Sequence, residues 1–345
     1  MRKNLRPRKV PQALFLEGPM KFRNIISLLL LLALLLTGCG EALPVTTEPP
    51  QSPAEAAMED MAQVLMGKFS SLQVGFIGGE WPVIGLIRSG AEIPQSYLDE
   101  YYGNLEAYVQ SCGGVLHPRK YTEYSRVILA LTALGKDPAD VAGYDLLAPL
   151  GELEQTVFQG INGAVFALIA LDSGNYEVPR CRTQDTQATR ELYIQHILER
   201  EEEKGGWSLL GGGQEPDLTA MVLQALAPYR DREDVKAACD RAVAVLSALQ
   251  TETGGYRYGE SESCESVAQV IIALTALGID PQGDPRFVKN GHSLVDRLLD
   301  FYTPGQGFSH LPGEAPDGMA SEQSLLALAA FDRFRKGETP LYRMR

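Results

Sequence analysis

A short apolar motif recurs along most of the chain, and this repetition restricts the fold more than any other feature. Residues 130–138 read ALTALGKDP and residues 273–281 read ALTALGIDP, so only one of nine positions differs. Weaker copies bring the total to six, and the copies begin at residues 85, 130, 167, 225, 273 and 327. The uneven spacing excludes an exact repeat but leaves room for about one pair of helices per copy.

Each copy ends a segment rich in Ala, Leu, Val and Ile that is apolar on almost every side, as expected of a buried helix. Amphipathic segments lie between the copies, at 96–110, 186–202, 232–250 and 287–302, with a less clear one at 138–155, and the segment 53–69 precedes the first copy. No segment shows the alternation of a strand. Six buried helices alternating with six outer ones predict an all-α fold, an α6/α6 toroid with an inner and an outer ring. The inner helices then run parallel, and their N-termini meet at one mouth.

Glycine-rich turns, usually followed by an aromatic residue, precede the inner helices and mark this mouth. They include Gly78-Gly79-Glu80-Trp81, Gly113-Gly114, Gly205-Gly206-Trp207, Gly254-Gly255-Tyr256 and Gly307-Phe308. Two roles are open for Trp81, Trp207, Tyr256 and Phe308. They either stack on a ligand at the mouth or pack onto a neighbouring repeat and hold the ring together.

The segment from Gln250 to Tyr256 fits the Gln-x-x-x-Gly-x-aromatic repeat of squalene cyclases, and Glu201 to Trp207 is similar with Glu in place of Gln. Residues 75–343 therefore resemble the prenyltransferase/squalene-cyclase repeat superfamily. The stretches 160–179, 186–193 and 321–342 resemble secreted bacterial members of this group. The resemblance implies an α/α toroid but specifies little chemistry.

One acidic stretch is a candidate catalytic site. Squalene-hopene-type cyclases carry an Asp-x-Asp-Asp-Thr-Ala motif, and this chain has Glu215-Pro216-Asp217-Leu218-Thr219-Ala220. The resemblance implies Asp217 as proton donor with Glu215 beside it, although Leu218 replaces the last carboxyl. The alternative is a helix start, in which Glu215 caps the helix, Pro216 opens it and Asp217 faces the helix dipole. We favour the helix start.

Further polar residues gather near the expected mouth: Glu123, Tyr258, Glu265, His310, Asp317 and Glu322. Paired carboxylates can hydrolyse a glycoside, but acidic residues also offset the positive ends of six converging helices, which is the interpretation we favour. A zinc site of Asp217, Cys264 and His310 has suitable ligand types without supporting spacing. We expect no metal and no cofactor.

The N-terminus reads as a targeting segment. Residues 25–36 are a twelve-residue apolar run after a basic stretch, and they end in Leu36-Thr37-Gly38-Cys39. This resembles a bacterial lipobox, which implies lipidation of Cys39 and attachment to the outer face of the cell membrane. We expect a signal peptide at 1–38, with Met20 as an alternative start of translation, a proline-rich tether at 39–53 and the toroid at 54–345.

Charge excludes one class of partner. Without residues 1–38, which hold seven Lys/Arg and one Glu, the chain has 24 basic and 43 acidic residues and a net charge of −19. Such a chain does not suit nucleic acid or electrostatic docking on anionic lipid. The four other cysteines, Cys112, Cys181, Cys239 and Cys264, are scattered along the chain. This spacing favours buried free thiols, with a disulfide as the alternative.

The sequence thus predicts a lipid-anchored toroid that binds a small molecule, lipid or glycan at its mouth without catalysis. A squalene-type cyclase that uses Asp217 is the alternative. Because such cyclases pair two toroidal domains and this chain has one, the binding function is favoured.

Overall fold

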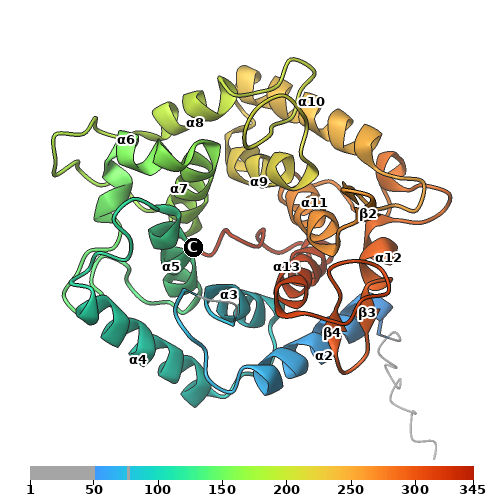
Figure 1. Ribbon diagram of the computed structural model, residues 1–345, viewed down its shortest axis with the longest axis horizontal. Helices are drawn as coiled ribbons and strands as arrows, with labels where there is room; N and C mark the ends of the chain where they lie inside the picture. Colours follow the sequence, from blue (N-terminus) through green and yellow to red (C-terminus); the bar gives the residue numbers. More distant parts are fainter. Residues whose placement is uncertain (1–50, 76–77) are drawn as a thin grey trace, which may run out of the picture. The chain divides into compact units, whose positions relative to one another are not determined.

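Two concentric rings of helices make up the part of the chain that the computed structural model describes, residues 51–75 and 78–345 (Figure 1). The inner ring within these residues has six helices: α3 (Glu80–Ser89), α5 (Thr122–Ala133), α7 (Ile161–Ser173), α9 (Pro216–Leu226), α11 (Cys264–Ala276) and α13 (Gly318–Arg335). The outer ring has six more: α2 (Pro53–Lys68), α4 (Gln95–Ser111), α6 (Leu153–Thr156), α8 (Arg190–Leu198), α10 (Glu233–Leu249) and α12 (Leu294–Leu299). The predicted all-α toroid is confirmed.

The outer helices α8 and α12 are shorter than the amphipathic segments that predict them. In each, a capping residue inside the segment sets the first residue of the helix. Thr189 accepts a hydrogen bond from Leu192 N at the start of α8. Ser293 forms a capping box with Asp296 at the start of α12. The third outer element is broken into η1 (Ala148–Gly151), α6 and η2 (Val157–Gln159), which explains its unclear pattern in the sequence.

The ring closes where the last inner helix, α13, packs against the first, α3. Gly85 permits this close approach, since a Cβ added there would lie 3.1 Å from Leu325 Cδ2. Helices α9, α11, α13 and α3 pack extensively in turn, whereas α7 and α9 contact each other less. The seam between α7 and α9 is therefore the loosest in the inner ring.

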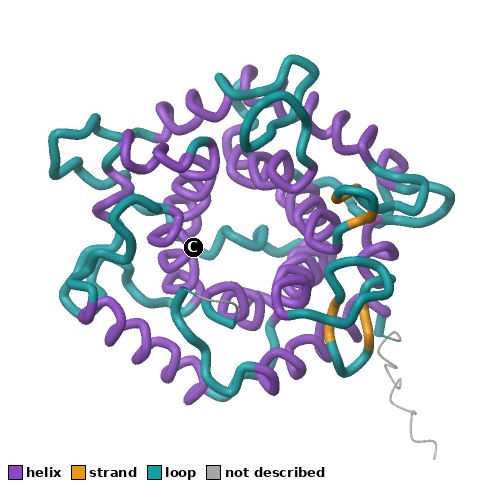
Figure 2. Tube along the Cα trace, viewed as in Figure 1, coloured by secondary structure: helices purple, strands orange, loops and turns teal. Residues whose placement is uncertain are grey.

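Two small hairpins differ from the expectation that the chain has no strands (Figure 2). They pair β1 (Arg257–Tyr258) with β2 (Ser261–Glu262), and β3 (Tyr302–Thr303) with β4 (Gly307–Phe308). Strands of two residues are too short to produce an alternating sequence pattern. They shape the turns that lead into α11 and α13.

The C-terminal segment after α13, residues 337–345, crosses the ring at the end where the inner helices finish (Figure 1). At the end of α3, the Arg88 side chain donates hydrogen bonds to Leu341 O (2.8 Å) and Pro340 O (3.0 Å). Burial of this guanidinium lowers the pKa of Arg88 to about 10. Across the ring, Met344 N donates to Ser173 O, the last residue of α7, at 2.9 Å. We call residues 337–345 the tail, and the end of the ring that it crosses the base.

The predicted signal peptide, Cys39 and most of the tether lie outside the described residues. Among the residues that are described, no single helix is long and apolar enough to cross a membrane, and one bent pair, Leu153–Gln159 with Ile161–Ser173, reaches the required length and composition only jointly.

Candidate binding site

The aromatic residues of the glycine-rich turns lie inside the protein. Trp207, Tyr256 and Phe308 are fully buried. Trp207 Nε1 donates to Ile197 O on α8 at 2.9 Å, and the Phe308 ring packs on Tyr302 with centroids 5.1 Å apart. Trp207 and Phe308 thus have structural contacts, whereas the buried Tyr256 hydroxyl has no hydrogen-bond partner among the described residues. Tyr258 lies on β1, and its side chain is outside what the structure describes.

The acidic stretch at 215–217 forms the start of α9. Glu215 is the residue before the helix, Pro216 opens it and Asp217 lies in its first turn. The Glu215 side chain does not cap the helix; instead it accepts a hydrogen bond from Leu209 N at 3.2 Å. Asp217 is exposed to solvent. Protonating an alkene requires an acid held in a dry cavity, so this placement favours the helix start over the proton donor.

Three of the predicted mouth carboxylates have structural partners. Glu123 forms an ion pair with Arg126, and Glu265 Oε2 lies 2.7 Å from His310 Nδ1. Asp317 caps α13 by accepting from Ala320 N at 2.9 Å. These residues stand at the starts of inner helices, where their negative charge offsets the helix dipoles. None of them lines the cavity described below.

A buried pair of carboxyl groups lies at the seam between α13 and α3. Glu80 is fully buried, and it accepts hydrogen bonds from Arg126 Nε (2.8 Å), Gly75 N (2.9 Å) and Tyr101 Oη (3.3 Å). Glu322 on α13 accepts from Gly78 N just before α3. Burial, and then the nearby Glu80 charge, raise the pKa of Glu322 to about 7. Glu80 is thus paired with the Arg126 guanidinium, whereas burial favours the protonated form of Glu322.

A cavity of about 220 Å³ lies inside the inner ring, and it is the strongest candidate for a ligand site. Trp81 on α3 and Phe166 on α7 contribute aromatic rings whose centroids are 6.2 Å apart. Met221 and Leu326 add apolar surface, and Tyr342 of the tail also borders the cavity. No Asp, Glu, His, Lys or Arg side chain lines it within the described part of the protein.

Three glutamines, one from each of three consecutive inner helices, form the polar wall of this cavity. Gln224 Nε2 donates to Gln269 Oε1 at 2.9 Å, and Gln269 Nε2 donates to Gln323 Oε1 at 3.1 Å. Among the described residues, Gln224 Oε1 and Gln323 Nε2 have no protein partner, although each amide can make further hydrogen bonds. The amide chain therefore offers an acceptor at one end and a donor at the other to a ligand.

Of the residues that line this cavity, only Trp81 is predicted from the sequence as a site residue. The polar wall does have a sequence signal, because α9, α11 and α13 each carry a single glutamine inside an otherwise apolar segment. A polar residue in a buried helix calls for a partner, and the pattern could have placed all three on the inner face. Tyr342 has no such signal, because no local sequence pattern predicts where the tail runs.

Two of the proposed zinc ligands lie close together, because Cys264 N donates a hydrogen bond to His310 O at 3.0 Å. All four described cysteines are free thiols, with Cys239 and Cys264 buried and Cys112 and Cys181 half-buried. Burial raises the pKa of Cys239 to about 12. Cys264 Sγ faces Ser324 Oγ at 3.2 Å, away from any ligand set. In the described ranges, no three His, Cys, Asp or Glu side chains are arranged to hold a metal ion.

Comparisons with known proteins show the same architecture. No protein-family model matches the chain, and no curated protein matches its sequence. An unsaturated glucuronyl hydrolase from Bacillus sp. GL1, responsible for the degradation of glycosaminoglycan, has a similar structure, with a TM-score of 0.56, 13% identity and coverage of 85% of this chain and 99% of that chain. A Candida albicans protein geranylgeranyltransferase-I complexed with GGPP is similar to the same degree, with a TM-score of 0.56, 13% identity and coverage of 85% and 96%. At this identity the likeness shows the fold alone, an α/α toroid.

Proposed function

We propose that this protein is a non-catalytic binding module, and that the cavity inside its inner ring holds an uncharged ligand with one apolar face and several hydroxyl groups, such as a sugar unit of a glycan. The cavity that Trp81 shares with the glutamine chain is the observation that carries this proposal. An aromatic ring offers its face to the C–H groups of a sugar, while the amides at the ends of the chain bond its hydroxyl groups.

The absence of charged groups from the cavity wall supports binding over catalysis. A diphosphate needs cationic or metal partners, and glycoside hydrolysis needs two carboxyl groups flanking the bond. Neither requirement is met by the residues that line the cavity. A cyclase has less support, because Asp217 is exposed and stands apart from the cavity lining.

The protein is proposed to act on the outer face of a bacterial cell membrane, with a lipid on Cys39 as its anchor. The lipobox-like stretch 36–39 supports this proposal. A Cys39→Ser variant is expected to be released from the membrane or to stay unprocessed. Wild-type fractionation and migration of that variant would contradict the anchor and leave the cavity proposal standing.

Tryptophan fluorescence tests the cavity directly. The chain has only two tryptophans, and Trp207 is fully buried while Trp81 borders the cavity. Titration with neutral mono- and oligosaccharides is expected to change the emission of the wild-type protein. A Trp81→Phe variant should lose this change. A Gln269→Leu variant interrupts the amide chain and should weaken binding by about tenfold, the equivalent of about 1.4 kcal/mol.

Two results would overturn the proposal. One is that no neutral saccharide binds at millimolar concentration. The other is that binding is unchanged in Gln269→Leu, with calorimetry as the readout. An exposed substitution, Gln282→Leu, serves as the matched control and should bind as the wild type does.

A further inference from the structure

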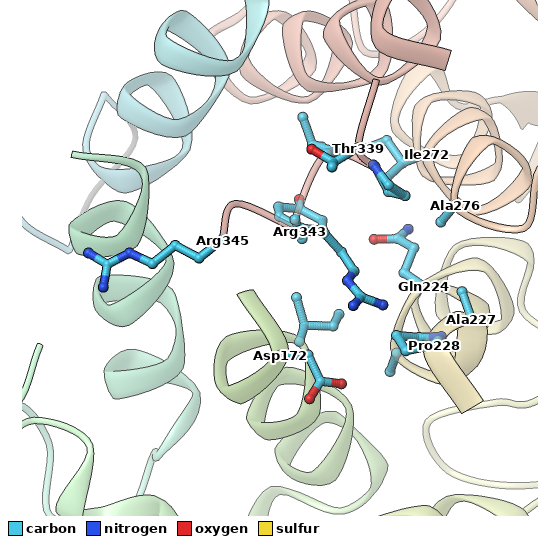
Figure 3. A pocket seen from close by; sticks show the side chains of 14 residues that line it. Asp172, Gln224, Ala227, Pro228, Ile272, Ala276, Thr339, Arg343 and Arg345 are labelled. Atoms are coloured by element: carbon cyan, nitrogen blue, oxygen red, sulfur yellow. The ribbon is translucent and has the colours of Figure 1, made fainter. Parts of the chain in front are cut away.

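A second cavity lies at the base of the ring, below the tail (Figure 3). Its volume is about 300 Å³, at the lower end of the range for small-molecule sites. Its walls come from the last turns of α7, α9 and α11 and from the tail. Small side chains at Ala225, Ala227 and Ala276 leave the space open, and Ile169 and Ile272 supply its larger apolar surfaces.

Two exposed arginines of the tail, Arg343 and Arg345, line this cavity, and neither side chain has a partner among the described residues. Figure 3 shows Arg343 reaching from the tail toward Gln224 and Pro228, whereas Arg345 points away from them. Among the described residues, the Arg343 guanidinium forms no ion pair, and the only hydrogen bonds of this residue are made by its backbone. Its N–H donors are therefore available beside an apolar wall.

The acid in the cavity does not neutralise Arg343. Asp172 Oδ1 accepts from Arg190 Nε at 2.9 Å, and Asp172 Oδ2 accepts from Tyr229 Oη at 2.7 Å. Both carboxylate oxygens are thus engaged, and the charge of Asp172 is balanced by Arg190. The positive charge of Arg343 stays unbalanced in a chain that is acidic overall.

Helix capping does not account for Arg343 either. Three inner helices end at this cavity, and their C-termini carry partial negative charge. Other donors already bond the carbonyl groups at the ends of α11 and α7. Arg230 donates to Leu277 O at 3.1 Å, and Met344 N donates to Ser173 O at 2.9 Å. Arg190 adds a cation beside the end of α7.

From these observations we propose that the base cavity is a second ligand site, which adjoins the ring cavity at Gln224 and Tyr342, and that it binds a small amphiphilic anion. The anionic group, a carboxylate, pairs with the guanidinium of Arg343 in the two-pronged geometry that these groups favour. The apolar body of the ligand lies between Ile169 and Ile272. The partial negative charges at the helix C-termini oppose an anion, so the pairing with the Arg343 guanidinium is needed for the anion to bind.

Calorimetry on the full chain with octanoate tests this site. Octanol and octylammonium are probes of equal length without the charge or with the opposite charge. Octanoate is expected to bind, with the other two at least tenfold weaker. Arg343→Gln should weaken octanoate binding at least tenfold, and Ala276→Leu should weaken it by filling the apolar part of the cavity. Arg180→Gln, an exposed arginine outside the cavity lining, is the matched control and should bind octanoate as the wild type does.

Thermal unfolding of each variant checks that it is folded, so that a loss of binding can be assigned to the site. Equal binding of octanol and octanoate would overturn the proposal, as would the failure of octanoate to bind at millimolar concentration. Unchanged octanoate binding in Arg343→Gln and Ala276→Leu would place the ligand elsewhere and overturn it as well. Saccharide binding at the ring cavity is measured separately, so that the two proposals fail independently.

Discussion

The two ends of the toroid are built by different means. At the mouth, six glycine-rich or capped turns lead into the inner helices, and Glu80, Glu123 and Glu265 there form ion pairs within the protein. At the base, the tail spans the opening as a single segment. Hydrogen bonds to the Arg88 side chain and to Ser173 O hold it in place. Local sequence repeats thus form the mouth, whereas long-range hydrogen bonds form the base.

The two ends also differ in how many large apolar side chains they expose. Val115, Phe158, Leu209, Leu210 and Met319 are exposed, and each lies in the segment that leads into an inner helix or in its first turn. None of the large exposed apolar side chains in the described residues belongs to the tail. Two further exposed side chains, Tyr108 on α4 and Tyr144 after α5, lie outside these segments. The segments that lead into the inner helices therefore expose more large apolar side chains than the tail does.

The largest expected effect comes from the aromatic residues of the glycine-rich turns. Trp207→Ala should reduce the free energy of unfolding by about 3–5 kcal/mol, because it removes a fully buried ring and the hydrogen bond to Ile197 O. Trp81→Ala should cost less, since Trp81 is only partly buried and borders a cavity. Denaturant unfolding measures both. A larger loss for Trp81→Ala would reverse the structural and binding roles assigned here.

The next effect concerns the Glu322 carboxyl at the mouth. Its pKa in the folded protein, about 7, is above the ordinary value of 4.5, so the folded state binds more protons than the unfolded state between these values. The free energy of unfolding should therefore fall as pH rises from about 4.5 to about 7, by roughly 3 kcal/mol from this group.

Glu322→Gln should remove most of that fall and raise the melting temperature at pH 8. An exposed control, Glu203→Gln, should keep the wild-type pH dependence. Melting temperatures between pH 4 and pH 8 measure the difference. Parallel profiles for the wild type and Glu322→Gln would show that the carboxyl is ionised throughout.

At the base, Arg88→Met should reduce the free energy of unfolding by about 2 kcal/mol. The substitution keeps an apolar stem but removes the charged donors that hold the tail carbonyl groups. Proteolysis near residues 340–345 should become faster, which denaturant unfolding alone would not show. A stable variant with a protected tail would mean that Met344 and the buried Leu341 hold the base without Arg88.

The smallest effect is expected at the start of α9. Asp217→Asn should cost about 0.3–1 kcal/mol, because the exposed side chain contributes mainly its interaction with the helix dipole. A melting temperature above that of the wild type, together with loss of a polyprenyl cyclisation that the wild type performs, would instead make Asp217 an active-site acid.

How far the sequence predicts this molecule depends on whether a feature is local or repeated. The ring of paired helices was predictable because each ALTALG-like segment has the composition of a buried helix and each intervening segment that of a half-exposed one. The helix start at Pro216 was predictable because its signals lie within three residues. The ring cavity was only partly predictable, because Trp81 belongs to a turn motif but the three glutamines become one chain only after the ring closes. The base cavity was not predictable, since it depends on the non-local contacts of Arg88 and Met344.

The closure of α13 on α3 has a consequence for the order of folding. Both partners of this seam exist only when residues 318–335, near the end of the chain, have been synthesised. Until then, α3 has no cover on that side, and its apolar face is open to aggregation or to a chaperone. Contacts between segments so distant in sequence also slow folding. We therefore expect the native ring to form in one step, and only after residues 318–335 have been synthesised.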